Sequence, residues 1–102
     1  MRALLYQPGQ PPQPVSVAGF VLPTETTGFV DEASRVATVL DCAPGLVDVL
    51  ASGRDYVAFS IFDHEGEPNP DAMKVLSDLT GTAFDVNEDD ELLRGPILFV
   101  TR

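Results

Sequence analysis

The chain has 102 residues, of which 44% are hydrophobic, and its 16 acidic and 6 basic residues give a formal charge of −10. This length predicts a single domain over residues 1–102, and the apolar content is too high for a disordered chain of this charge. The charge excludes a typical nucleic-acid binder and disfavours an anionic membrane surface, because both need clustered Lys and Arg.

The first half of the chain predicts two strands followed by a helix. Residues 3–7 form a short apolar run, and the proline-rich segment 8–14 then excludes a helix or a central strand. A second extended stretch is expected over about 15–22. Apolar residues next recur at helical spacing, which predicts a helix over about 31–42 that ends before Pro44.

The second half predicts two strands, a second helix and a closing strand. Residues 46–50 alternate in polarity, and 55–63 contain the run YVAFSIF, which is typical of a strand. The sequence NPD at 69–71 is a strong helix start, since Asn caps and Pro suits the first helical position. We expect this helix to end at Gly81, and the apolar residues 97–101 to form a central strand.

This order of elements predicts an α+β fold, with a small, mostly antiparallel sheet of about five strands and two helices. We expect both helices on one face of the sheet. Ala58 and Ser60 are small residues that alternate with larger apolar ones, so a helix is expected to pack closely against their face.

The sequence contains no complete metal-binding or catalytic motif, and we expect neither a cofactor nor enzymatic activity. Asp85, Asn87 and Asp89 match the first ligand positions of a calcium loop. The match then fails, because Asp90 replaces the turn glycine and Pro96 replaces the closing glutamate. A solvated acidic loop is the simpler interpretation, with no bound metal.

Other candidate chemistry is equally incomplete. Cys42 and His64 are the only residues of their types, so a disulfide within the chain is excluded and a Cys–His pair would need both. Acids alternate around this histidine, at Asp63, Glu65 and Glu67. One nitrogen ligand is too few for a typical zinc site, so an exposed turn is expected.

Acidic residues are densest in residues 85–91, the acidic segment, where helix capping and turns do not explain them. Its five acids are Asp85, Glu88, Asp89, Asp90 and Glu91. They predict binding to a basic or DNA-binding host protein, as an inhibitor or a mimic of a nucleic-acid surface. The alternative without a partner is that the acids keep a small protein soluble.

A second functional alternative is a protein that sequesters a small molecule or a nucleotide signal. One small domain has little interior for a pocket, so this function predicts a site between the protomers of a homodimer. An anionic ligand would further require several arginines to converge. The candidates are Arg2, Arg35, Arg54 and Arg94.

Three features carry a family resemblance: MRALL at 1–5, GLVDVL at 45–50, and DHEG at 63–66 followed by Asn69 and GPILFV at 95–100. In these the chain resembles a family of short proteins encoded mainly by bacteriophages and actinobacterial mobile elements, catalogued as domain of unknown function 3846. It departs from that family at Asp63, where Asn is usual. The resemblance implies a viral accessory protein that binds a host factor or a defence signal, and it supplies no catalytic residues.

The sequence also carries an expectation about location. A single cysteine is compatible with a reducing compartment. The apolar stretch near the N-terminus is too short for a signal peptide, and no run approaches the length of a membrane span. We therefore expect a cytoplasmic protein, in the host bacterial cytoplasm if the chain is phage-encoded.

Overall fold

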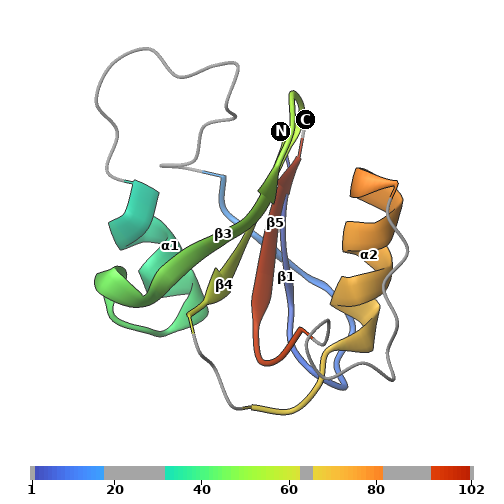
Figure 1. Ribbon diagram of the computed structural model, residues 1–102. Helices are drawn as coiled ribbons and strands as arrows, with labels where there is room; N and C mark the ends of the chain where they lie inside the picture. The colour runs from blue at the N-terminus through green and yellow to red at the C-terminus, as the bar shows by residue number, and fades with distance from the viewer. Residues whose placement is uncertain (1, 18–31, 63–65, 82–92, 102) are drawn as a thin grey trace.

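The computed structural model describes residues 2–17, 32–62, 66–81 and 93–101. It contains a five-stranded antiparallel sheet with a helix on each face (Figure 1), which confirms the predicted α+β fold. The strands follow the spatial order β2-β1-β5-β4-β3. The elements are β1 (Arg2–Tyr6), β2 (Gln13–Val15), α1 (Glu32–Leu40), the short 3-10 helix η2 (Pro44–Leu46), β3 (Val47–Ser52), β4 (Tyr56–Ile61), α2 (Pro70–Thr80) and β5 (Ile97–Thr101).

The two helices lie on opposite faces of the sheet, so the expectation of a single covered face is wrong (Figure 1). Val36 and Leu40 of α1 pack on one face, and Ala72 and Leu76 of α2 pack on the other. The reason lies in β5, where residues 97–100 are all buried. A strand with apolar side chains on both faces needs a layer on each side.

The central position predicted for the last strand is confirmed, because β5 lies between β1 and β4. The small residue Ala58 of β4 is fully buried and packs in the same cluster as Ala72 and Leu76, which confirms that a helix lies close to this face. On the same face Tyr6 and Phe99 meet edge to face, with ring centroids 5.4 Å apart.

The predicted limits of α2 are confirmed at both ends. Asn69 is the N-cap, Pro70 occupies the first helical position and Asp71 lies in the first turn. Gly81 ends the helix in the left-handed conformation, with φ of 72°, and its N–H donates to the carbonyl of Ser77 (2.8 Å). Only glycine adopts this φ without a steric cost from Cβ.

Asn69 also joins three parts of the chain, a contact set that we call the Asn69 junction. Its side chain is 1% exposed, and Nδ2 donates to the carbonyl oxygens of Tyr6 (2.9 Å) and Gly95 (2.8 Å). Oδ1 accepts from the N–H of Ala72 (3.4 Å), and the Asn69 N–H donates to the carbonyl of Leu93 (2.8 Å). The junction therefore positions the end of β1, the start of α2 and the approach to β5.

We predict that Asn69→Asp lowers the free energy of unfolding by about 3 kcal/mol. The carboxylate keeps the capping acceptor but cannot donate to the carbonyls of Tyr6 and Gly95, which would stay buried without their partner. Urea denaturation followed by circular dichroism measures the loss. Asp71→Asn is the matched control, an exposed position two residues away, and should cost less than about 1 kcal/mol. Equal stability of Asn69→Asp and the parent protein would contradict the prediction.

The end of α1 carries a strained residue. Asp41 follows the helix with φ of 60°, and the next N–H, of Cys42, donates to the carbonyl of Ala37 (3.0 Å). This is the hydrogen bond that closes a helix at a left-handed residue. A residue with Cβ is strained there, and a carboxylate beside the negative end of a helix is repelled.

We predict that Asp41→Gly raises the free energy of unfolding by about 0.5–1 kcal/mol, because it removes both the strain and the repulsion. Thermal denaturation would show it as a higher melting temperature. Asp41→Ala removes the charge but keeps Cβ, so its stability should fall below that of the glycine variant. Glycine and alanine variants of equal stability would show that backbone strain at this position is negligible.

Candidate functional site

The acidic segment, with Asp85, Glu88, Asp89, Asp90 and Glu91, lies outside the described residues, so its binding role stays a prediction. The same holds for the calcium-like residues there and for His64 with its two neighbouring acids. Within the part of the chain that is described, no three His, Cys, Asp or Glu side chains come together as a metal site.

The charge is unevenly divided between the described ranges and the rest of the chain. Nine of the 16 acids lie outside the described residues, whereas only one of the six bases, Arg102, does. The described residues, with seven acids and five bases, are therefore close to balanced in charge. Most of the negative charge that could attract a partner belongs to the remaining segments.

The arginines named for an anionic ligand lie on separate elements. Arg35 Nη2 donates to the carbonyl of Ser16 (3.2 Å), and Arg94 Nη1 donates to the carbonyl of Gly66 (3.2 Å). Arg54 lies in the turn between β3 and β4, and Arg2 begins β1. Arg35 and Arg94 thus each hold a backbone carbonyl from another part of the chain. Among the described residues, the arginines do not come together as a site for an anionic ligand would need.

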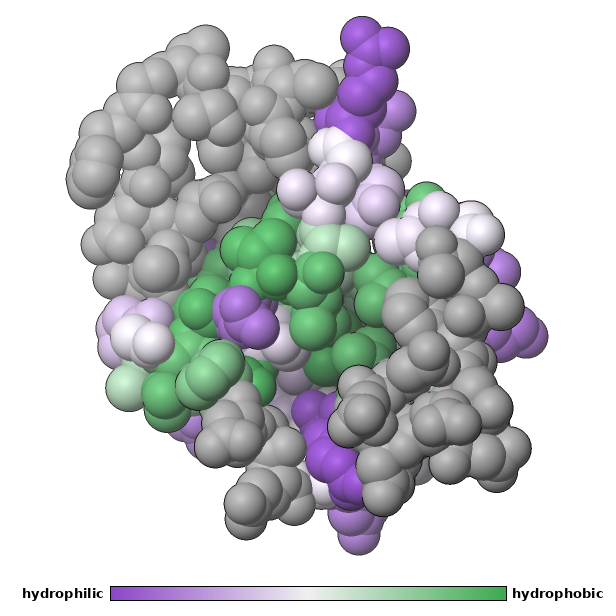
Figure 2. All heavy atoms as spheres, viewed as in Figure 1, coloured by the Kyte–Doolittle hydropathy of each residue, from purple (hydrophilic) through white to green (hydrophobic). Residues whose placement is uncertain are grey.

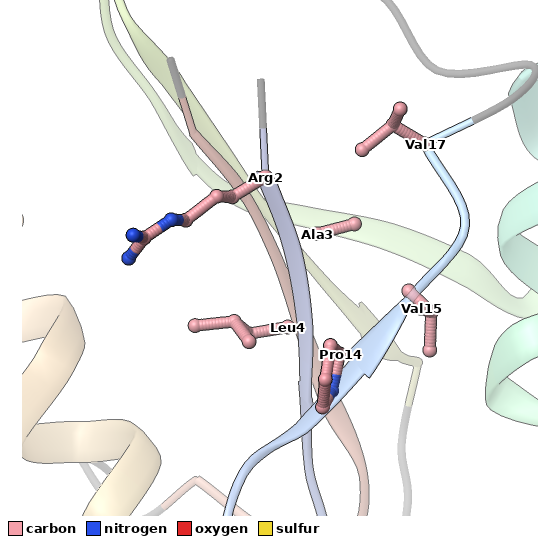
Figure 3. Close-up of a pocket in the computed structure, with 6 residues that line it drawn as sticks. All are labelled: Arg2, Ala3, Leu4, Pro14, Val15 and Val17. Carbon is pink, nitrogen blue, oxygen red and sulfur yellow. The ribbon is translucent and has the colours of Figure 1, made fainter.

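An open hollow lies beside β1 and β2, but it does not resemble a ligand pocket. Figure 3 shows Arg2 and Leu4 pointing to the α2 side of the sheet, whereas Ala3 and Val15 lie on the α1 side. Its lining therefore wraps around the edge of the sheet instead of enclosing a space. Among the described residues of the lining, Arg2 is the one that is charged, so they offer little to orient a polar ligand.

The two edges of the sheet differ in character. β2 has three residues and contains Pro14, which has no N–H to donate to a further strand. β3 has six residues, VDVLAS, and no described strand pairs with its outer side, which we call the β3 edge. A long apolar edge without proline is a surface on which another chain can add a strand.

Exposed apolar side chains gather at the β3 edge. Val49 is 53% exposed, and Leu46 and Phe62, which adjoin β3 and β4, are 42% and 63% exposed. Among the described residues only Val17, at 37%, is another exposed large hydrophobic residue. Figure 2 shows apolar surface over this part of the molecule, in the view that places β3 in front. Clustered apolar exposure of this kind indicates an interaction surface.

The backbone groups at the β3 edge follow from its pairing with β4. Phe62 N–H donates to the carbonyl of Leu46 (2.7 Å), and the register then pairs Val47 with Ile61 and Val49 with Phe59. Hydrogen-bonded and non-hydrogen-bonded pairs alternate along an antiparallel ladder. The Val47 carbonyl and the N–H and carbonyl groups of Val49 therefore point away from β4, whereas the Val47 N–H donates to the carbonyl of Pro44 in η2.

The register shifts between Val49 and Ala51, which leaves Leu50 as a bulge. Leu50 and Ala51 consequently both pack against the cluster under α2. Regular alternation over 46–50 was expected from the sequence, and the bulge interrupts it. The uninterrupted part of the β3 edge therefore ends at Val49.

Cys42 is half-buried at the end of α1. Burial raises the pKa of its thiol, and the neighbouring carboxylate of Asp41 raises the pKa further. A thiol that is protonated at neutral pH is a weak nucleophile. The described structure thus gives Cys42 the character of a packing residue.

We predict that Cys42 reacts with iodoacetamide more slowly at pH 7 than an exposed cysteine in a short peptide, and that its rate rises with pH up to values above the ordinary thiol pKa of 9.0. The sign follows from the raised pKa, since less thiolate is present at any given pH. Asp41→Asn should increase the rate at neutral pH because it removes one cause of the shift. A Cys42 that reacts as fast as the peptide thiol would contradict the assignment.

The comparisons with known proteins give no family to which the chain can be assigned. No family model, curated protein or solved structure matches it. The resemblance to domain of unknown function 3846 stays a prediction. In the described part of the chain, neither helix is long and apolar enough to cross a membrane.

Proposed function

We propose that this protein acts without catalysis, by binding another protein that has a basic surface. The observation that carries the proposal is the β3 edge, with which no described strand pairs and which has three exposed large hydrophobic residues next to it. The excess of acids supports a basic partner, because opposite charge speeds association and suppresses acidic competitors.

The acidic segment and the β3 edge have different roles in this proposal. Five carboxylates within seven residues create a local negative field that attracts a basic surface before contact. Apolar side chains supply binding energy only after contact, when they leave water. The acidic segment thus steers the encounter, and the exposed apolar residues hold the complex together.

The family resemblance supports a more specific setting for this function. It implies an accessory protein made during phage infection, which acts in the host bacterial cytoplasm. A DNA-binding host protein has the basic surface that the proposal requires. Carboxylates of the acidic segment would then occupy positions that DNA phosphates take, so the host protein would be inhibited by competition.

Affinity capture from bacterial lysate tests the proposal, with the intact protein as bait. The test variant neutralises the acidic segment as Asp85→Asn, Glu88→Gln, Asp89→Asn, Asp90→Asn and Glu91→Gln. We expect one identified protein to be recovered with the parent bait and to fall on the order of tenfold with this variant or at high salt.

A control variant tests exposed acids outside the acidic segment. Glu67→Gln with Asp78→Asn removes two exposed acids from the described residues and should leave recovery within about twofold of the parent level, because these acids lie outside the proposed contact. Recovery that is insensitive to salt and to both variants would overturn the proposal, as would equal losses with the two variants.

A further inference from the structure

We propose that the β3 edge binds an extended segment of the partner, in which a basic side chain lies between two apolar ones. This inference rests on the proposed function and names the part of the partner that is recognised. The segment would lie along Val47, Asp48 and Val49 and extend the five-stranded sheet by one strand.

The backbone of β3 supplies the first part of the argument. The Val47 carbonyl and both backbone groups of Val49 point outward on a regular stretch that begins at the hydrogen bond between Phe62 and Leu46, while the Val47 N–H is bonded to the Pro44 carbonyl. No described strand satisfies these groups. An added strand would replace their bonds to water with bonds to another backbone, whatever its sequence.

Side chains on the same stretch select the sequence of the segment. Val47 and Val49 face the α1 side, where their cross-strand partners Ile61 and Phe59 also lie. Asp48 lies between them on the α2 side and is exposed. Neighbours on one face of a sheet interact directly, so an added strand gains from apolar residues beside the two valines and from a Lys or Arg beside the aspartate.

Charge favours a foreign segment over a second copy of this chain. Two copies each carry a formal charge of −10 and repel one another. An antiparallel pairing of two β3 strands about this stretch would also bring the two Asp48 carboxylates near each other on one face, which is destabilising. A basic segment is attracted by the same charges.

The bulge sets the length of the contact. Because the register shifts after Val49, a flat strand can follow the β3 edge from Val47 to Val49 and then diverges. Leu46 and Phe62 lie at the start of that stretch, where their exposed side chains can cover the end of a bound segment. The site therefore recognises a few residues, and the steering charge of the whole chain adds to a small apolar contact.

A short fluorescein-labelled peptide of alternating Val and Lys is the probe, titrated against the full chain and followed by fluorescence anisotropy. We expect saturable binding that shifts the amide resonances of Val47 and Val49 in ¹⁵N spectra. A peptide with Glu in place of Lys should not bind. A peptide with Pro in place of the central Val should bind on the order of tenfold more weakly, since it lacks a backbone donor.

Two variants of this protein locate the binding. Asp48→Lys and Asp78→Lys make the same charge change at exposed positions, one on β3 and one on α2. Asp48→Lys should weaken the Val-Lys peptide on the order of tenfold, and Asp78→Lys by less than about threefold. Unchanged thermal melts confirm that both variants fold.

Two outcomes would overturn the inference. Equal weakening by the two variants would mean that the peptide responds to net charge alone. Sedimentation of a dimer that Val49→Lys dissociates would mean that a second copy occupies the β3 edge. The lysate capture separates this inference from the proposed function. If the Asp48→Lys bait still recovers the lysate protein, and the bait with the neutralised acidic segment does not, this inference fails while the proposed function stands.

Discussion

The Asn69 side chain is the one large polar group in the described core, and three segments depend on its hydrogen bonds. Its amide donates to carbonyls at the end of β1 and before β5, while its oxygen caps α2. Buried carbonyls without donors cost free energy, so the three segments are stable together only around this residue. The backbone bonds from Asn69 to Leu93 and from Gly95 to Glu67 join the same strands of chain.

This arrangement explains why the sheet has two covered faces and two unlike edges. The junction ties the end of β1 to the approach to β5, and β5 lies between β1 and β4, where its apolar run faces both helices. The remaining strands β2 and β3 become the edges. Pro14 removes a backbone donor from β2, whereas β3 carries only Asp48 and a bulge to hinder the addition of another strand. Natural edge strands are commonly protected from self-association by such a charge or bulge.

Most of the acids lie outside the described residues, whereas the described residues include an exposed apolar surface beside β3. The described body is nearly balanced in charge, and its exposed hydrophobic residues gather at the β3 edge. Most acids lie in the other segments, above all in the acidic segment. A binding protein benefits from this division, because long-range attraction and short-range contact can be tuned separately.

The sequence by itself determined the local elements. Asn69, Pro70 and Gly81 mark the limits of α2 because caps and φ preferences act within a few residues. The apolar run at 97–101 predicted a central strand. Because consecutive residues of a strand face opposite sides of the sheet, the same run also indicates two covered faces, which the prediction of both helices on one face did not take into account.

Only the tertiary structure decided which strands became edges, where each arginine lies, and that Leu46, Val49 and Phe62 stay exposed. These properties depend on contacts between residues far apart in the chain. The alternating polarity of residues 46–50 is typical of a half-buried strand, and it is the same whether that strand lies at the edge or in the centre of a sheet. Their exposure follows from strand order, which the long-range hydrogen bonds of Asn69 and the packing of two helices determine.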